Sequence, residues 1–238
     1  MKKRYPATAI ICILLLCTLF LTGCFGAEVI KEVEDIDKST RIIKHVEVGS
    51  ESNYTEYRLQ YIKDEQMFDV WWSPRLRPAL DFLKQNSKPS DMVLTWWDNG
   101  HLIRGYTRRD PIVWTPHYDL LETVAGGKWD ESELGEFATK DDLTNVAYAL
   151  LADSPSITQG IMKRYGARWV FVARIDQQKI AGMVQLMDED IKNYLDDLNE
   201  PKASIRHKVL FKMADGWNVD GFHLRYEDDY AYVYERVG

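Results

Sequence analysis

Residues 168–173, Arg-Trp-Val-Phe-Val-Ala, have the near-continuous apolar character of a strand that is buried on both faces. A predicted helix that ends at Tyr165 precedes this run, and Gly166 suits a helix end. Another strand is predicted at 92–96, with a helix at 141–152 between the two. Strands separated by helices pair in parallel and carry the helices on the sheet faces. The sequence therefore predicts a layered α/β domain with a mostly parallel or mixed sheet flanked by helices.

The composition agrees with a folded chain and argues against a nucleic-acid partner. The 238 residues are 45% hydrophobic and 28% charged, which is enough for one large domain or two small ones with a real core. The net charge is −7, and no stripe of Lys and Arg is visible. Nucleic-acid binding depends on clustered basic residues that neutralise phosphates, so we expect no such partner.

The N-terminal residues 1–24 are predicted to anchor the protein at a membrane. Three basic residues at 2–4 precede an apolar run at 7–21, and Leu21-Thr-Gly-Cys24 follows, as in a lipoprotein signal peptide that ends at a lipidated Cys24. An uncut membrane anchor is the alternative, because residues 7–25 are just long enough to span a bilayer. Both place the rest of the chain on the extracytoplasmic side of the cell membrane. No Cys follows Cys24, so we expect no internal disulfide and no thiolate metal site.

Residues 25–66 are predicted to form a spacer and a β-hairpin region. The spacer is charged, and strand-like runs at 41–48 and 54–62 flank a loop. This loop holds Asn53-Tyr54-Thr55, an N-glycosylation sequon, so Asn53 is a candidate modification site. The remaining residues, 67–238, are predicted to be the globular α/β domain. Its other predicted elements are helices at 75–86 and 118–124 and a strand at 111–115.

The stretch Trp96-Trp97-Asp98 lies where the predicted strand at 92–96 gives way to a turn at Asn99-Gly100. Open α/β sheets keep their binding sites at the carboxyl ends of their strands. Indole N–H groups donate hydrogen bonds and a carboxylate accepts them, which suits a small hydroxyl in an apolar surround. The alternative is a core aromatic pair with a capping Asp, and the packing role of Trp favours it.

A second candidate set follows the strand at 168–173. A long helix is predicted at 176–198, and Asp176, Lys179 and Met183 stand at i, i+3 and i+7 on one face of it. If the two strands are parallel, this face can look toward the Trp-Trp-Asp turn. An N-capping Asp with an ordinary surface Lys is the alternative, and the spacing alone favours it.

No catalytic residue, metal site or cofactor site is predicted. The five His residues lack metal-ligand spacing, and neither a Gly-x-Ser-x-Gly elbow nor a phosphate-binding Gly-rich loop occurs in the chain. Pairs such as Asp141-Asp142 are neighbours in sequence, which is typical of solvated faces.

The two candidate sets together resemble the globular domain of oligosaccharyltransferase catalytic subunits. The similarity is to archaeal forms, which carry Trp-Trp-Asp-Tyr-Gly and then an Asp-x-x-Lys-x-x-x-Met motif. It runs from about Pro78 to the end and includes closing strands at 221–226 and 232–235. Asn99 stands where the family has Tyr. The family's catalytic site lies in a multi-span membrane domain, which we expect this chain to lack.

The resemblance implies recognition of Asn-x-Ser/Thr sequons in acceptor polypeptides. By this resemblance the residues that bind the Ser or Thr hydroxyl are Trp96, Trp97 and Asp98, Met183 contacts the Thr methyl, and Asp176 and Lys179 brace the pocket. The chain would then be a sequon-binding relative without catalysis of its own, with a full-length oligosaccharyltransferase as its candidate partner, and two alternatives stand beside this interpretation. One is the soluble half of a split transferase that acts with a separate membrane subunit. The other is a carbohydrate-binding surface lipoprotein that uses its eight Trp residues as sugar platforms.

Overall fold

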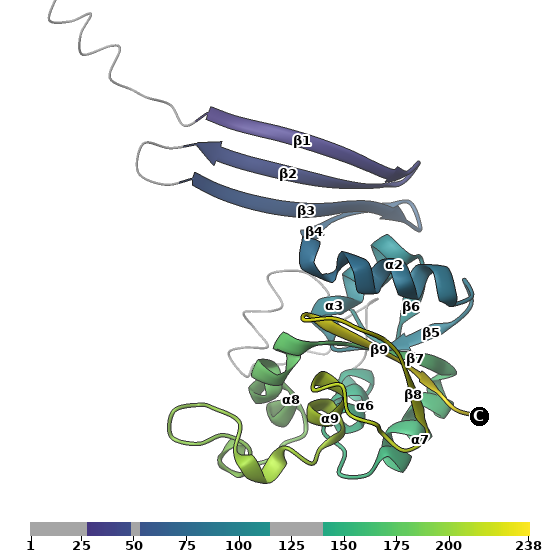
Figure 1. The fold of residues 1–238 in the computed structure, drawn as a ribbon, viewed down its shortest axis with the longest axis vertical. Helices are drawn as coiled ribbons and strands as arrows, with labels where there is room; N and C mark the ends of the chain where they lie inside the picture. The colour runs from purple at the N-terminus through teal and green to yellow at the C-terminus, as the bar shows by residue number, and fades with distance from the viewer. Residues whose placement is uncertain (1–27, 49–52, 115–139) are drawn as a thin grey trace, which may run out of the picture.

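The computed structural model describes residues 28–48, 53–114 and 140–238 (Figure 1). The predicted signal or anchor segment with Cys24 and the predicted helix at 118–124 lie outside these residues. Within the described ranges, no helix combines the length and apolar character needed to cross a membrane.

The first described part is a four-stranded antiparallel sheet with the order β1-β2-β3-β4. We refer to it as the N-terminal sheet. The pairing of β2 with β3 confirms the predicted hairpin, with Thr40 opposite Tyr61. The strands are β1 Glu28–Asp37, β2 Thr40–Val48, β3 Asn53–Lys63 and β4 Gln66–Trp71.

The second sheet has five strands in the order β6-β5-β7-β9-β8. Strand β5 pairs in parallel with β6 and β7, whereas β9 pairs antiparallel with β7 and β8. The predicted mixed sheet is therefore confirmed, and so are the closing strands. The strands are β5 Met92–Leu94, β6 Asp110–Pro111, β7 Ala167–Ala173, β8 Phe222–Glu227 and β9 Ala231–Arg236.

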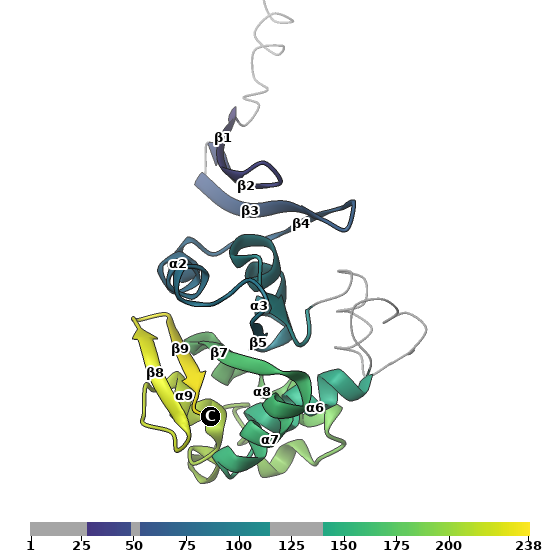
Figure 2. The same ribbon diagram turned by 90° about the vertical axis from the view of Figure 1, so that its right-hand side faces the viewer.

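Helices cover both faces of the mixed sheet, as the predicted layered architecture requires. Figure 2 shows α2 and α3 between the two sheets, and α6, α7, α8 and α9 on the far side of the mixed sheet. The α-helices are α2 Arg77–Asn86, α3 Trp97–Leu102, α6 Lys140–Leu150, α7 Pro155–Tyr165, α8 Ile180–Leu186 and α9 Val209–Ala214. A π-helix continues α3 at Ile103–Thr107, and short 3-10 helices lie at Pro74–Leu76, Arg174–Lys179, Ile191–Asn193 and Ala203–Ile205.

Strand β7 joins two hydrophobic cores because its side chains alternate between the faces of the sheet. Val170 and Val172 belong to the cluster with α6 to α9. Trp169 and Phe171 belong to the cluster with α2, the π-helix and the N-terminal sheet. This double burial explains why the sequence of β7 is apolar almost throughout.

Two predictions about local structure are wrong, and a third, the strand at 111–115, is largely so, since β6 covers only Asp110–Pro111. The helix predicted at 176–198 is interrupted: α8 ends at Leu186, and Asp188 takes a left-handed φ of 53° that redirects the chain. The turn predicted at Asn99-Gly100 is instead the middle of α3. Gly100 serves close packing there, because a Cβ at this position would lie 2.5 Å from the Cα of Trp114 and from the carbonyl oxygen of Val113.

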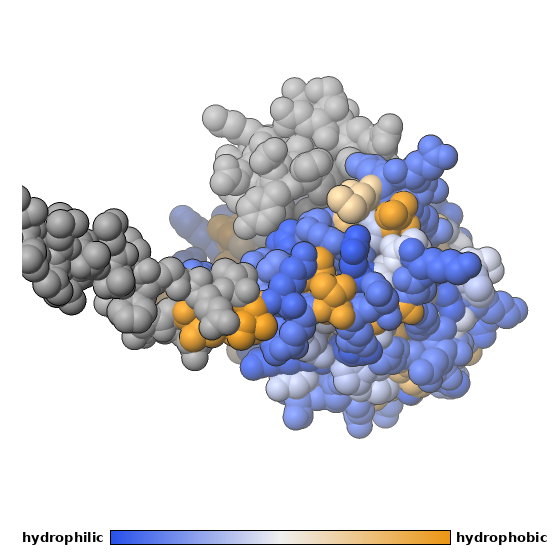
Figure 3. Space-filling model, turned by 90° about the horizontal axis from the view of Figure 1, so that it is seen from above, coloured by the Kyte–Doolittle hydropathy of each residue, from blue (hydrophilic) through white to orange (hydrophobic). Residues whose placement is uncertain are grey.

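Strand β1 forms the outer edge of the N-terminal sheet. Seen from this side, the described surface is mostly hydrophilic, with hydrophobic side chains in separate groups (Figure 3). Ile30 and Val33 are exposed, but charged residues alternate with them along β1. Charges on an edge strand disfavour the addition of a further strand.

Arg108 ties the N-terminal sheet to the π-helix. Its guanidinium lies 3.0 Å from Asp37 Oδ1 and also hydrogen-bonds to Ser39 and Thr40. The backbone N–H of Ser39 donates to the same Asp37 oxygen. Partial burial would raise the pKa of Asp37, but these hydrogen bonds outweigh it and lower the pKa to about 2.

The Asp37 contact predicts a defined loss of stability in acid. Because the folded-state pKa lies below the ordinary value of 3.8, the stabilisation is present above about pH 4 and is lost as the pH falls toward 2. Asp37→Asn should cost about 1 kcal/mol of unfolding free energy at pH 7, after allowance for solvent screening, and almost nothing at pH 2. Urea unfolding of both proteins across this pH range measures the difference. A cost that does not change with pH would contradict the assignment.

The packing of Gly100 predicts opposite results for two Gly→Ala changes. Gly100→Ala should destabilise the protein by about 1 to 3 kcal/mol, because the new methyl meets backbone atoms of another segment that cannot move aside. Gly160→Ala in α7 is the matched control, since a Cβ added there would have nothing within 4 Å, and it should stabilise by about 0.5 to 1 kcal/mol. Thermal and urea unfolding measure both changes, and equal effects would refute the close-packing explanation.

Candidate functional site

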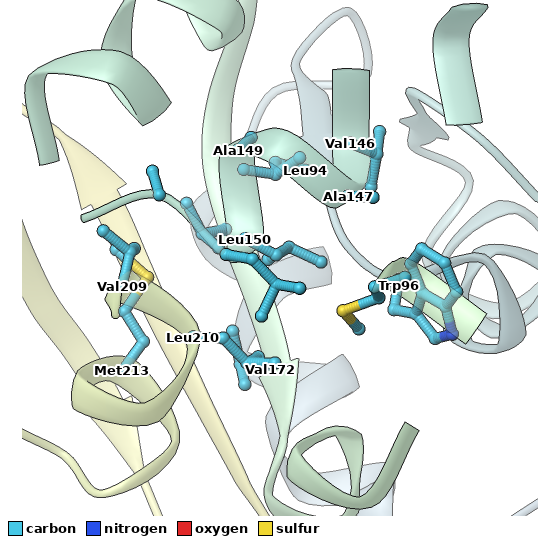
Figure 4. Packing of buried hydrophobic residues seen from close by; sticks show 14 of the residues in the cluster. Leu94, Trp96, Val146, Ala147, Ala149, Leu150, Val172, Val209, Leu210 and Met213 are labelled. Atoms are coloured by element: carbon cyan, nitrogen blue, oxygen red, sulfur yellow. The ribbon is translucent and has the colours of Figure 1, made fainter. Parts of the chain in front are cut away.

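The two Trp residues of the first candidate set lie at the junction of β5 and α3. Strand β5 ends at Leu94, Trp96 is extended, and Trp97 begins the helix. The two rings are 5.4 Å apart at 45°, and both belong to the core, with only 2% of Trp96 and 6% of Trp97 exposed. Figure 4 shows Trp96 on the opposite side of this cluster from Val209 and Met213. In this structure, therefore, both indoles are packed in the hydrophobic core, as the alternative interpretation of the Trp pair proposes.

The second candidate set begins where β7 ends. Asp176 lies in the 3-10 helix Arg174–Lys179 with 1% of its surface exposed. Its Oδ2 accepts the backbone N–H of Ala173 at 2.9 Å. An acidic residue that reaches back three positions in this way satisfies a free N–H group at a helix start. Asp176 thus caps the start of the helix, as the alternative interpretation proposes, but it does so from within the first turn and not from the N-cap position.

Lys179 connects the two sets. Its Nζ lies 2.8 Å from Asp98 Oδ2 and 3.1 Å from Asp176 Oδ1. Asn99, the neighbour of Asp98, donates from Nδ2 to Asp176 Oδ2 at 2.9 Å. We call Asp98, Asn99, Asp176 and Lys179 the Asp176 cluster. The structure thus brings together residues from two segments that are 77 positions apart.

The pKa values of Asp176 and Lys179 are both shifted upward from their ordinary values. Complete burial raises the pKa of Asp176, against the opposing effect of Lys179 and of the Ala173 N–H, and the charge of Asp98 raises it further. Burial alone would lower the pKa of Lys179, but the two carboxylates outweigh it and raise that pKa above its ordinary value. Lys179 is therefore an ammonium ion at neutral pH and a fixed donor between two acceptors.

The apolar members of the candidate set are enclosed. Met183 in α8 has no exposed surface, and the Trp96 ring lies against the same helix, 3.9 Å from where a Cβ at Gly182 would be. In contrast, 37% of the Asp98 side chain and 25% of the Lys179 side chain are exposed. Asp98 and Lys179 are therefore the members of the two candidate sets whose side chains keep partial exposure, whereas the two indoles and the thioether are enclosed.

Sequence reasoning missed the contact of Asn99, since Asn followed by Gly was interpreted as a turn. No local sequence pattern predicts a hydrogen bond to a residue so distant in the chain. Of the other predicted sites, Cys24 lies outside the described residues, and Asn53 is the first residue of β3. Among the residues that the structure describes, no group of three or more His, Cys, Asp or Glu side chains is arranged to hold a metal ion.

The burial of Asp176 predicts a large cost for its removal. Asp176→Ala should lower the unfolding free energy by about 3 kcal/mol, because it leaves the Asn99 amide and the Ala173 N–H without their acceptor and removes one of the two carboxylates that bind Lys179. Asp153→Ala is the control, since Asp153 pairs with Lys208 on the surface and exposed pairs contribute about 1 kcal/mol or less. Urea unfolding measures both. Equal costs would show that the buried carboxylate is not a structural hub.

Comparisons with known proteins find a similar fold and one short segment of similar sequence. No protein-family model matches the chain. A segment of 35 residues, 15% of the chain, is 53% identical to dolichyl-phosphooligosaccharide-protein glycotransferase 2 of Pyrococcus furiosus and 56% identical to that of Pyrococcus horikoshii. This segment spans only 5% of the length of either relative.

The structural comparison covers much more of the chain. The C-terminal globular domain of an oligosaccharyltransferase from Archaeoglobus fulgidus superimposes with a TM-score of 0.53 at 15% identity. The match includes 70% of this chain and 99% of that domain. The chain therefore has the fold of the C-terminal globular domain of archaeal oligosaccharyltransferase, the family that its sequence motifs resemble.

Proposed function

We propose that this protein binds Asn-x-Ser/Thr sequons of acceptor polypeptides on the extracytoplasmic side of a membrane, in connection with protein N-glycosylation. The observation that carries the proposal is the position of Lys179, whose Nζ contacts both Asp98 and Asp176. This contact unites the two motifs by which the chain resembles oligosaccharyltransferases. In this proposal the acceptor polypeptide is the partner, and no cofactor takes part.

The exposed pair of the cluster has the chemistry needed for a hydroxyl group. Such a group donates one hydrogen bond and accepts others. The Asp98 carboxylate can accept from a Ser or Thr hydroxyl, while Lys179 Nζ can donate to the hydroxyl oxygen. An Ala at the same peptide position would cover this polar pair without supplying the hydrogen bonds that a hydroxyl offers, which costs about 1 to 3 kcal/mol.

Full recognition of Thr requires a movement at α8. Trp96, Trp97 and Met183 are buried in the structure, so the Thr methyl can reach Met183 only after the packing of α8 against the Trp96 ring opens. A Met side chain adapts to either the Thr methyl or its absence in Ser. The proposal therefore includes an open form in which the indoles and the thioether line the pocket.

The distribution of Trp side chains bears on the carbohydrate-binding alternative. Among the described residues, Trp71 and Trp217 are the Trp side chains that are more than half exposed. They belong to β4 and to the segment after α9. Trp72, Trp96, Trp97 and Trp169 are buried and offer no platform for a sugar.

Anchoring and domain organisation form part of the proposal. Residues 1–24 would hold the protein at the membrane, either by lipidation of Cys24 or by a retained anchor, and Asn53 would be a candidate acceptor in the protein itself. The division into residues 25–66 and 67–238 stays a prediction.

The fold is that of a transferase domain, so association with a separate membrane subunit is tested by glycan transfer in membranes with and without this protein. Unchanged transfer would refute that association.

Peptide titration tests sequon binding. We expect an Asn-x-Thr peptide to bind about tenfold tighter than the matched Asn-x-Ala peptide, which corresponds to about 1.4 kcal/mol. Asp98→Ala should abolish this ratio, because it removes the acceptor for the hydroxyl. Calorimetry or fluorescence anisotropy with the full chain gives both affinities.

The control for this titration is Asp153→Ala, which removes a surface carboxylate paired with a different Lys. It should leave both affinities unchanged. A wild-type protein that binds the two peptides equally, or an Asp98→Ala protein that still discriminates, would rule out sequon recognition at this site.

A further inference from the structure

Asn99 belongs to the Asp176 cluster but lies behind the exposed pair that would meet a hydroxyl group. It is in the first turn of α3, directly after Asp98, and is 97% buried. Its amide donates to Asp176 Oδ2, a carboxylate in the segment that follows β7, the parallel neighbour of β5. We propose that Asn99 is a positioning residue that sets the specificity of the hydroxyl site through Asp176 and Lys179. This inference rests on the proposed function.

The two oxygens of Asp176 have separate tasks. Oδ2 accepts from Asn99 Nδ2 and from the backbone N–H of Ala173, both at 2.9 Å. Oδ1 accepts from Lys179 Nζ at 3.1 Å. Two donors on one oxygen fix the plane of the carboxylate group, and this plane decides where the other oxygen holds the ammonium group. Asn99 thus acts on Lys179 without touching it.

The contacts close into a ring. Asn99 binds Asp176, Asp176 binds Lys179, and Lys179 binds Asp98, which is joined to Asn99 by a peptide bond. The ring connects the start of α3 to the segment 174–179 at two points, so the position of one segment sets that of the other. A hydroxyl that binds between Asp98 and Lys179 would enter the exposed side of this ring, while Asn99 supports the buried side.

The absence of charge on Asn suits this position. Its side-chain amide is neutral, so it adds a donor beside Asp176 without adding charge to a cluster that already holds two carboxylates and one ammonium. An acidic residue at position 99 would place a third carboxylate against Asp176 in a buried site, where like charges repel strongly. The replacement of the Tyr of the family motif therefore retains a hydrogen-bond donor at this position.

The inference predicts that a protein without the Asn99 amide still folds but discriminates less between the Asn-x-Thr and Asn-x-Ala peptides. Without Asn99, Asp176 still has Ala173 and Lys179 as donors, so Asn99→Ala should fold. The ratio of Asn-x-Ala to Asn-x-Thr dissociation constants should fall at least threefold relative to wild type. Asn145→Ala is the matched control, because Asn145 also donates to a side chain, Tyr165 Oη at 3.0 Å, away from the cluster. It should leave the ratio unchanged.

An isosteric change separates positioning through Asp176 from a role in helix packing. Asn99→Asp should reduce the ratio more than Asn99→Ala, since two buried carboxylates then face each other. Asp and Asn have nearly the same shape, so a role confined to helix packing would make Asn99→Asp the milder change. A ratio in Asn99→Asp that is equal to or higher than that in Asn99→Ala would overturn the inference.

A measurement without peptide makes failure of the inference distinguishable from failure of the proposed function. The Lys179 ammonium resonance, observed by NMR in the free protein, should shift or broaden in Asn99→Ala and stay unchanged in Asn145→Ala. An unchanged resonance in Asn99→Ala would overturn the positioning role even if wild type discriminates between the peptides. Equal binding of both peptides by wild type would overturn sequon recognition, and with it the specificity role, whatever the resonance shows.

Discussion

A carboxylate that is shut away from water needs hydrogen-bond donors from the protein, and Asp176 obtains them from three places. The backbone at the end of β7, the first turn of α3 and Lys179 each supply one. An incorrect orientation of any of these parts would leave a buried polar group unsatisfied, at a cost of about 1 to 3 kcal/mol. This requirement fixes how the ends of the parallel strands β5 and β7 stand relative to each other. The arrangement of the candidate site follows from it.

The N-terminal sheet supports the same region from the opposite side. Tyr61 in β3 hydrogen-bonds through its hydroxyl group to Nδ1 of His101 in α3, at 2.7 Å. Its ring also fills the space beside Gly105, where a Cβ would lie 2.4 Å away. Helix α3 is therefore held between the N-terminal sheet and the segment that carries Asp176. The sheet that precedes the α/β part in sequence takes part in placing Asp98.

Much of the fold could be predicted from the sequence, because it depends on local patterns. The apolar run of β7, the capping residues around α7 and the alternation in β2 and β3 all correspond to observed elements. The helix predicted after Asp176 was too long, since periodicity gives no warning of the left-handed residue Asp188. Parallel pairing of β5 and β7 allows the helix face with Lys179 to look toward Asp98, although the spacing alone favours an ordinary surface Lys. The contact of Asn99 could not be predicted, because it depends on a distance in space that no sequence spacing encodes.

The enclosure of Trp96 and Met183 has a thermodynamic consequence for any ligand. A surface that is closed in the resting state becomes available only in a minor conformer, and the apparent affinity is weakened by the population of that conformer. If one molecule in a hundred were open, a ligand specific for the open form would bind about a hundredfold more weakly than its contacts allow. Selectivity and strength of binding would then be set by different parts of the molecule. The hydrogen-bonded ring of the Asp176 cluster would determine which ligand binds, and the packing of α8 against the Trp96 indole would determine the affinity.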